Sequence, residues 1–350
     1  DLVCVMDSRF APLSALTLNS AGVDNQNGSL LGSAIALDFG TATGDLNNAG
    51  GLITTAGNLS ITHLRDLTNS GGELSSAQTL NLNGRTLNNS NGKLISNNLL
   101  VLNADTLINQ NGLMSGWQGL TVSGANLDNR NNGTLSSRYG DLTATLTGSL
   151  LNSGAGALVS QKALTINAGE LDNSANGVLS SAAGQTLTVG GLLNNAQGGV
   201  IDSAATLSLN AQNLDNTAGS ISGGTATTLD LLATLTNTNG KLASGGPLLI
   251  SRVAQINNQG GQLASQGLLT LLTGGLDNRN RGTLAANDRV SIISSGRVQN
   301  DNDGLIYSQN ADLTLSANRL DNGKGAVQSQ NGLTLDVADA IDNQSGKLIA

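Results

Sequence analysis

Cysteine, proline, histidine and aromatic residues are nearly absent from this sequence. Its 350 residues include one cysteine, two prolines and one histidine, and the aromatic content is 1%. A single cysteine, Cys4, excludes an internal disulfide framework. So few aromatic side chains beside 46 glycines also argue against ordinary globular domains. We therefore expect the chain to bury its apolar surface in some other way.

The charge and hydropathy of the chain exclude several classes of protein. Charged residues make up 11% and apolar residues 38%, a combination that does not describe a disordered chain. The net charge of -8 opposes nucleic-acid binding, and no run of eighteen apolar residues is present to span a membrane. The opening DLVCVMDSRF has neither an initiator methionine nor a signal peptide. We therefore expect the chain to be a fragment of a longer protein.

What the sequence does contain is one phrase repeated along its length. The segment LNNSNGKLISNNLLVLNADTLINQNGLMSG, residues 87–116, holds two copies about twenty residues apart. An apolar residue, any residue and an asparagine recur with a mean period of about 21 residues. Glycine comes three or four residues after each asparagine. An apolar residue lies two positions after the glycine, and a small residue lies two positions after that. The recurrent asparagines are Asn25, Asn48, Asn69, Asn89, Asn109, Asn129, Asn152, Asn173, Asn195, Asn216, Asn237, Asn258, Asn278, Asn300, Asn322 and Asn343.

Within each repeat, apolar and other residues alternate with a period of two, which is the pattern of β-strands. No segment has the 3.6-residue spacing of an amphipathic helix. Each repeat therefore contains three short strands joined by corners, and stacking the repeats buries the apolar side of each. The sequence predicts an all-β, right-handed parallel β-helix of about sixteen turns. We expect a lead-in segment at 1–22, with a first partial turn from about 13, and a repeat domain at 23–350.

The recurrent asparagine shares the parity of the apolar residues, so it is expected to face inward. Stacked on its counterparts, each amide can donate a hydrogen bond to one neighbour and accept one from the other. The glycine that follows is expected to take a positive φ at the corner. A leucine-rich repeat is the nearest alternative fold, but its asparagine would fall three residues after Leu82, where this chain has Arg85. The predicted structural ladder comprises Asn89, Asn109, Asn129, Asn152, Asn173, Asn195, Asn216, Asn237, Asn258 and Asn278.

Residues that could carry catalysis or bind a metal are few. His63 is the sole histidine, Glu73 and Glu170 are the only glutamates, and Cys4 lies in the lead-in segment. Neither a metal site nor a catalytic triad can be assembled from these residues. We therefore expect no enzyme activity, no cofactor and no metal.

Other side chains leave weaker alternatives open. Trp117, Tyr139 and Tyr307 are placed singly, which argues against the aromatic platforms of a β-helical enzyme acting on polysaccharides. Aspartate often precedes the ladder asparagine and is expected to face outward, where calcium bridging is an alternative to simple solvation. Outward threonines suggest an ice-binding face, but their neighbours vary. At one corner, Arg279 is expected to stack against Asp301 of the next turn.

The repeated text LDN, then G, then LSS, at residues 127–137 and again at 171–181, resembles the repeats of filamentous haemagglutinin and of contact-dependent growth inhibition exoproteins. The resemblance covers residues 23–350. It implies a very large protein that a two-partner secretion pore exports across the outer membrane of a Gram-negative bacterium, and that forms a fibre outside the cell. The N-terminal secretion domain and the C-terminal toxin region of that family have no counterpart in this sequence.

The function that these observations favour is structural. We expect a rigid stalk segment of a secreted, surface-exposed exoprotein that projects adhesive or toxic domains toward a host cell or a neighbouring bacterium. The resemblance implies that the outer-membrane pore acts through an N-terminal domain outside this sequence. The alternative is that the segment is itself an adhesive binding module.

Apolar residues at outward positions mark a candidate partner patch. Leu232, Leu249, Leu268, Leu272 and Ile293 have the parity of the outer face in four successive turns. Stacked in one strip, they would form the contiguous exposed apolar surface that is typical of a contact site. Lateral docking of this strip on another copy of the fibre or on a neighbouring segment is one interpretation, and it is the less favoured of two. The favoured interpretation is a local shift of register or a corner that packs these side chains.

Overall fold

The computed structural model describes residues 14–350, so Cys4 and most of the predicted lead-in lie outside the described residues. The chain divides into two compact units, an N-terminal one ending at Gly169 and a C-terminal one beginning at Glu170. Both consist of parallel β-strands, and the one helical element among the described residues is a 3₁₀ turn, η1 (Gly40–Ala42). Each turn of the chain contributes one strand to a sheet of short strands, and about sixteen turns are present in all.

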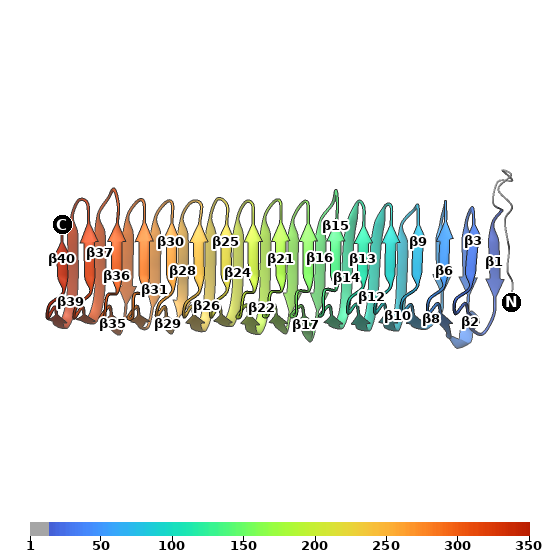
Figure 1. Ribbon diagram of the computed structural model, residues 1–350, viewed down its shortest axis with the longest axis horizontal. Coiled ribbons are helices and arrows are strands. Elements are labelled where there is room, and N and C mark those ends of the chain that lie inside the picture. The colour runs from blue at the N-terminus through green and yellow to red at the C-terminus, as the bar shows by residue number, and fades with distance from the viewer. Residues whose placement is uncertain (1–13) are drawn as a thin grey trace. The chain divides into compact units, whose positions relative to one another are not determined.

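In the N-terminal unit, each turn contributes one short strand to a parallel sheet, which we call the short-strand sheet (Figure 1). Its members are β3 (Ser29–Gly32), β6 (Leu52–Thr55), β9 (Glu73–Ser76), β11 (Lys93–Ser96), β13 (Leu113–Gly116), β15 (Thr134–Ser137) and β18 (Ala157–Ser160). The other two faces contain β1 (Leu16–Asn19), β2 (Val23–Asp24), β4 (Ile35–Asp38), β5 (Gly44–Asn47), β7 (Leu59–Thr62), β8 (Leu64–Thr68), β10 (Leu80–Asn88), β12 (Leu99–Ile108), β14 (Gly119–Asp128), β16 (Leu142–Leu146), β17 (Ser149–Leu151) and β19 (Leu164–Ala168).

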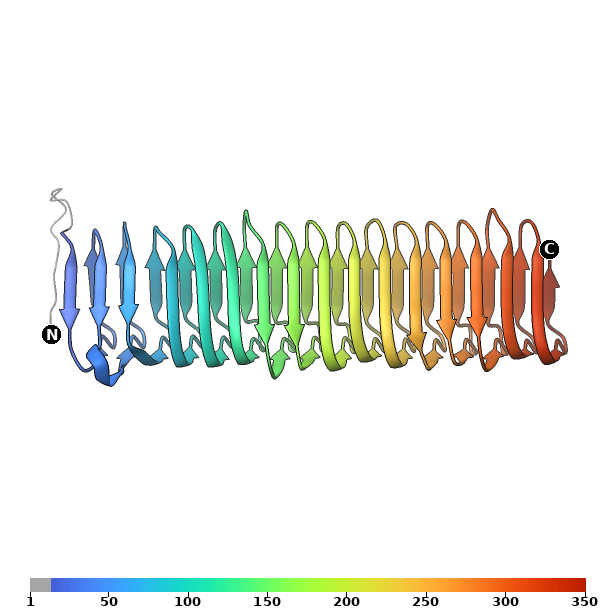
Figure 2. The same ribbon diagram turned by 180° about the vertical axis from the view of Figure 1, so that it is seen from behind.

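The C-terminal unit has the same arrangement, which Figure 2 shows from behind. Its short-strand sheet contains β21 (Val178–Ser181), β23 (Val200–Ser203), β25 (Ser220–Gly223), β27 (Lys241–Ser244), β30 (Gln262–Ser265), β33 (Thr283–Ala286), β36 (Leu305–Ser308), β38 (Ala326–Ser329) and β40 (Lys347–Ile349). The other two faces contain β20 (Glu170–Asp172), β22 (Gln185–Asn194), β24 (Leu207–Asp215), β26 (Thr227–Thr236), β28 (Leu248–Val253), β29 (Gln255–Asn257), β31 (Leu269–Thr273), β32 (Leu276–Asp277), β34 (Val290–Ser294), β35 (Arg297–Gln299), β37 (Leu313–Asp321) and β39 (Leu333–Asp342).

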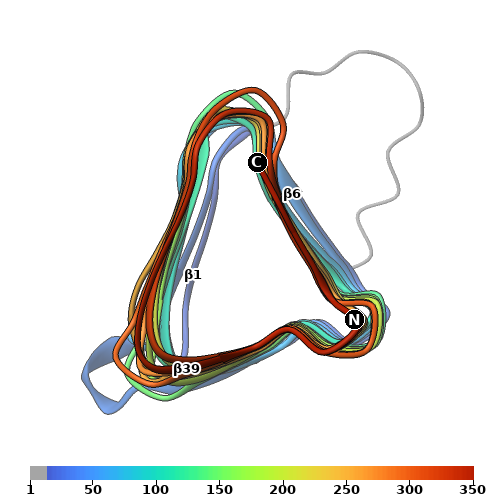
Figure 3. The same ribbon diagram turned by 90° about the vertical axis from the view of Figure 1, so that its left-hand side faces the viewer.

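Within each unit, the turns viewed end-on follow a triangle, because the long strands bend midway and supply two of the three sides (Figure 3). In the C-terminal unit, the last turn lies nearest the viewer, with β39 at the lower left and the end of β40 at the top. The chain therefore circles counterclockwise as it advances toward the viewer, which is a right-handed course. The predicted all-β parallel solenoid with three strands per turn is confirmed.

The core consists of columns in which like residues lie directly over one another. One column of the N-terminal unit contains Leu74, Leu94, Met114, Leu135 and Leu158, which pair in register on successive short strands. All five side chains are fully buried. A single turn exposes its apolar side on both edges, so each turn depends on its neighbours to bury it.

The corner after each ladder asparagine absorbs the variation in repeat length. In the four-residue corners the third residue takes a left-handed conformation, as at Asn91 and Asn111, with φ of 57° and 52°. The longer corner at residues 129–133 has two such residues, Asn131 and Asn132, with φ of 56° and 64°. Asparagine tolerates this conformation better than most side chains. The extra residue therefore lies outside the core, and the strands keep their register.

Two polar residues interrupt the apolar columns of the C-terminal unit. Gln185 and Thr227 are each 1% exposed, and they lie on either side of Leu207 in the register of the long strands. Neither the amide of Gln185 nor the hydroxyl of Thr227 has a hydrogen-bond partner among residues 14–350. An unpaired buried polar group destabilises the folded state, so these are weak points of the core.

Candidate functional site

The recurrent asparagines form a continuous hydrogen-bonded ladder within each unit. In every stacked pair within one unit, Nδ2 of one asparagine donates to Oδ1 of the asparagine in the next turn at 2.7 or 2.8 Å. The ten predicted ladder residues are all fully buried. Asn89, Asn109, Asn129 and Asn152 lie in the N-terminal unit, and Asn173, Asn195, Asn216, Asn237, Asn258 and Asn278 lie in the C-terminal unit.

Each ladder amide also binds the main chain at the corner. Nδ2 of Asn109 donates to the carbonyl oxygen of Gly112 at 3.1 Å and to that of Thr134, in the next turn, at 3.1 Å. The same nitrogen donates to Oδ1 of Asn129 at 2.7 Å. One side chain thus ties its own corner to the corner of the following turn. Because such bonds form without solvent competition, they fix the register of the stack.

The glycine that closes each corner is required for space, and the prediction of a positive φ at this glycine is wrong. The left-handed residue is the one before it, such as Gly71 with a φ of 67°. A Cβ on Gly72 would lie 2.1 Å from the carbonyl oxygen of Asn48 and 2.7 Å from Oδ1 of Asn69. The ladder therefore occupies the volume that a side chain would need, and this excludes every residue except glycine.

Two of the aspartates that precede the ladder asparagine, which are predicted to face outward, are covered by arginines and buried. Asp277 is 8% exposed and Asp321 is 3% exposed. Arginines cover both carboxylates: Arg279 binds Asp277 through Nη2 at 2.7 Å, and Arg297 and Arg319 both bind Asp321. Arg279 forms its ion pair within its own turn, with the carboxylate two residues away, and the charge of Asp301 in the next turn also acts on it, as predicted.

The ion pair shifts the protonation of the Asp277 carboxyl. Burial is the largest single influence and raises the pKa of this carboxyl. The hydrogen bonds and positive charge of Arg279, with a hydrogen bond from Gln259, more than offset burial and hold the pKa of this carboxyl below its ordinary value of 3.8. The carboxylate thus remains charged at neutral pH, where it stabilises the corner.

The residues considered for catalysis or metal binding do not come together. His63 contacts Asp38, with Nδ1 2.8 Å from Oδ1, at an exposed position beside the 3₁₀ turn η1. Glu73 lies 3.6 Å from Lys93 on the next turn, and Glu170 is exposed. Within residues 14–350, no three histidine, cysteine, aspartate or glutamate side chains are placed to hold a metal ion.

The register of the strands separates the five residues of the candidate partner patch. Leu272 lies beside Ile293 of the next turn, whereas Leu249 is level with Thr270, two positions earlier in the strand. Leu232 and Ile293 are 57% and 53% exposed, and Leu268 and Leu272 are each 37% exposed. The predicted single strip is therefore wrong in its geometry: the residues form a staggered patch, and only Leu272 and Ile293 stack directly.

An aromatic cluster on the N-terminal unit was missed, because Trp117 and Tyr139 are not isolated from each other. Their ring centroids lie 5.1 Å apart with the planes tilted by 55°. The guanidinium carbon of Arg138 lies 4.6 Å from the centroid of the Trp117 ring. Trp117 and Arg138 occupy the same position in successive repeats, directly after Gly116 and Ser137. Reading the sequence at its own period would have placed them together.

The described residues include no helix long and apolar enough to cross a membrane. The model of the haemagglutinin repeat family matches the chain five times, at residues 54–138, 135–196, 182–251, 228–302 and 302–345. No curated protein and no solved structure matches the chain significantly. The family matches cover the ladder corners of both units from Asn69 to Asn343.

Proposed function

The chain belongs to the haemagglutinin repeat family, and on this premise we propose that its turns form a stalk segment of a large, secreted filamentous exoprotein. The stalk holds adhesive or toxic domains away from the bacterial surface and directs them toward a host cell or a neighbouring bacterium. The observation that carries the proposal is the hydrogen-bonded asparagine ladder in each unit. It joins each turn to the turn before it and the turn after it through equivalent hydrogen bonds.

A chain of this kind suits export as an unfolded polypeptide. Stability in a solenoid comes from contacts between adjacent turns, so each turn that emerges can fold on the turn before it. The sequence has no pair of cysteines to form a disulfide before or during transport. In this proposal the pore is a two-partner secretion protein of the outer membrane, which recognises an N-terminal domain of the exoprotein.

Lateral contact between fibres is a second part of the proposal. Leu272 and Ile293 border a shallow hollow of about 400 Å³ together with Arg252. Exposed apolar side chains grouped in this way are typical of contact sites. The double change Leu272→Ser and Ile293→Ser is expected to leave the fold unchanged and to reduce association between copies of the chain in sedimentation. Unchanged association of the double variant would rule out a lateral contact through Leu272 and Ile293.

The stalk role is tested in the exported protein by comparing two deletions. Removing residues 196–300 joins Asn195 directly to the corner that follows Asn300, so the remaining turns stay in register. Removing residues 196–290 joins the same asparagine to the interior of β34 and breaks the register. We expect the first deletion to permit secretion and target-cell contact, and the second to prevent folding.

A matched pair of surface changes separates a stalk from a binding module. Ser208 and Thr314 lie on the outer face of the long strands, in β24 and β37, and contribute to neither ladder nor core. Changing both to alanine is expected to leave target-cell attachment unchanged. Loss of attachment with an intact fold would show that this face binds the target itself.

A further inference from the structure

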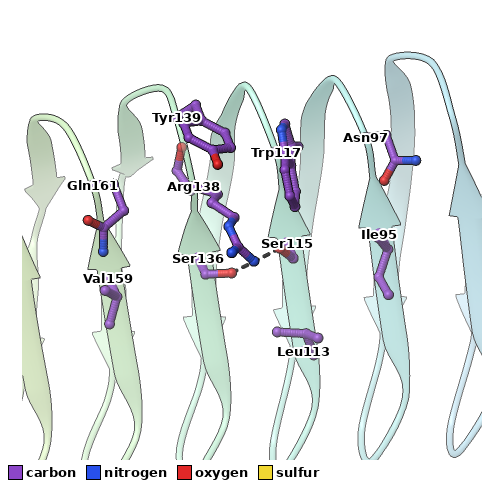
Figure 4. Close-up of a pocket in the computed structure, with 11 residues that line it drawn as sticks. Ile95, Asn97, Leu113, Ser115, Trp117, Ser136, Arg138, Tyr139, Val159 and Gln161 are labelled. Atoms are coloured by element: carbon purple, nitrogen blue, oxygen red, sulfur yellow. Dashed lines mark hydrogen bonds between the residues drawn. The ribbon is translucent and has the colours of Figure 1, made fainter.

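The aromatic cluster lies on the outer face of the short-strand sheet of the N-terminal unit. Trp117 and Tyr139 follow the ends of β13 and β15, and they are 38% and 54% exposed. Two of the three tyrosine and tryptophan residues of the whole sequence therefore meet at one exposed point. Figure 4 shows the Tyr139 ring near the Trp117 ring and the Arg138 side chain extended below them toward Ser136. Single exposed apolar residues are ordinary on protein surfaces, but aromatic side chains and an arginine gathered at one exposed point are typical of a contact site.

Two hollows adjoin the Trp117 ring. A hollow of about 630 Å³ extends over four successive turns, from Asn97 on one side to Gln161 on the other. Leu113 and Val159 give it an apolar floor, as Figure 4 shows. A second hollow of about 280 Å³ is lined by Asn97 and Trp117 alone. The indole therefore has Arg138 against it and also borders open space shared with the Asn97 amide.

The polar groups at this site are free to bind a ligand. Within residues 14–350, the side chains of Asn97 and Gln161 have no hydrogen-bond partner, and Arg138 forms no ion pair. The other arginines of the N-terminal unit differ in this respect. Arg65 binds Asp45, Arg85 binds Asp66, and Arg130 binds Asp128. Arg138 is thus the arginine in the described part of this unit whose charge no carboxylate of the chain neutralises.

We propose that this cluster binds an oligosaccharide that carries a carboxylate, such as a uronic or sialic acid. The apolar face of a pyranose ring fits against the exposed indole, because its C–H groups are attracted to the negative face of an aromatic ring. The Asn97 and Gln161 amides are placed to bond with hydroxyl groups along the hollow. A guanidinium held by an aromatic ring binds a carboxylate with two parallel hydrogen bonds.

The dimensions favour a short sugar chain over a protein partner. Four strands spaced by about 4.8 Å span roughly 15 Å, which matches two to three sugar rings. A stable protein interface buries on the order of 800 Å² on each side and has a wide apolar centre. The lining mixes three aliphatic side chains, Ile95, Leu113 and Val159, with polar ones, including Ser115 and Ser136, which are hydrogen-bonded to each other at 3.0 Å. This inference goes beyond the stalk role and does not depend on it.

The single tryptophan of the sequence makes the site directly observable. Trp117 emission in the complete chain is titrated with three probes: a trimer of galacturonic acid, a sialylated trisaccharide and the neutral trimer maltotriose. We expect a saturable change with at least one acidic probe and binding at least tenfold weaker for maltotriose. Arg138→Gln is expected to weaken acidic-probe binding about tenfold, and Arg289→Gln, which removes an exposed charge from the C-terminal unit, is expected to have no effect.

Two further variants complete the test. Tyr139→Ala is expected to weaken binding several-fold by fluorescence, and Trp117→Ala to abolish it by calorimetry, with circular dichroism checking that both variants are folded. Absence of saturable binding by all three probes overturns the proposal. Equal binding of acidic and neutral probes, or equal loss in Arg138→Gln and Arg289→Gln, refutes the carboxylate site. Capture of sugar-free target protein that requires Trp117, without binding of any probe, assigns the cluster to a protein partner instead.

Discussion

Replacing Asn89 by alanine tests what the ladder contributes to stability. The Asn89 side chain is fully buried, and its Nδ2 donates to Asn109 Oδ1 at 2.7 Å and to the carbonyl oxygens of Gly92 and Leu113 at 3.2 and 3.0 Å. Its Oδ1 accepts from Asn69 Nδ2 at 2.7 Å. Alanine removes all four bonds at once.

These lost bonds are not equal in cost. The carbonyl oxygen of Gly92 still accepts from Leu113 N at 2.9 Å, and Asn69 Nδ2 keeps its bonds to Gly72 and Lys93. Asn109 Oδ1 loses its side-chain donor within the core. One such orphaned acceptor costs about 1–3 kcal/mol, and the small cavity adds to it, so we expect a total loss of about 2–4 kcal/mol.

The neighbouring asparagine provides the control. Asn88 is half-buried and points outward, where its Oδ1 accepts from Ser90 N at 3.0 Å. Asn88→Ala is expected to cost about 1 kcal/mol or less. Both variants are measured by urea denaturation with Trp117 fluorescence, which reports unfolding of the N-terminal unit. Equal losses of stability for Asn88→Ala and Asn89→Ala would refute the reasoning about the ladder.

Three further predictions concern the corners and the core. Gly112→Ala should lower the free energy of unfolding by about 3 kcal/mol or more, because a Cβ there lies 2.2 Å from the carbonyl oxygen of Asn89. Gly71→Ala should lower it by about 1–2 kcal/mol, because Gly71 has a φ of 67° but no atom within 4 Å of the added Cβ. Thermal melts that rank the two variants in the reverse order contradict the steric explanation. Gln185→Leu should raise the free energy of unfolding by about 1–3 kcal/mol, because it removes an unpaired buried amide, and the exposed Gln309→Leu should change it by less than about 0.5 kcal/mol in chemical denaturation. Asp277 has a lowered pKa, so its stabilisation is present above its ordinary value of 3.8 and is lost as pH falls through the lower folded value. Asp277→Asn should therefore cost about 1 kcal/mol at pH 7, and the difference from the native chain should shrink toward pH 3; a constant difference in urea midpoint would exclude this pair as its cause.

The sequence predicts the solenoid well because the same constraint is written in every repeat. The parity of the recurrent asparagine relative to the preceding leucine specifies which way both side chains face, and sixteen copies remove the ambiguity of any single one. The reason for the glycine could not be read in the same way. A recurrent glycine is compatible either with a positive φ or with another group packed against its Cα. Only the structure, in which the carbonyl oxygen of Asn48 packs against Gly72, distinguishes the two explanations.

Surface features were harder to predict, since they depend on where each repeat inserts its extra residues. The patch around Leu272 was predicted from parity alone, and bulges such as the one between Ile250 and Val253 shift neighbouring turns against one another. Stacking of the repeats predicts that Asp301 of the next turn lies near Arg279, but it does not reveal the closer ion pair with Asp277, two residues away in the same turn. The aromatic cluster could not be predicted from the number of aromatic residues. It follows only from their positions within the repeat, where Trp117 and Arg138 are equivalent in successive turns.

The account depends most on the claim that the turns stack at one strand spacing and are stiff, so that the number of repeats specifies a distance. The outward positions Thr186, Ser208, Thr228, Leu249, Thr270, Ser291 and Thr314 lie in register on successive turns of the C-terminal unit. Spin labels are placed on cysteines at Thr186 and Thr270, or at Thr186 and Thr314, in a chain with Cys4→Ser, and the interspin distances are measured by pulsed electron paramagnetic resonance. At about 4.8 Å per turn, we predict narrow distributions separated by about 10 Å, centred near 19 Å and 29 Å. Broad distributions, or distances that do not increase with the number of turns, would contradict a stalk built from stacked repeats.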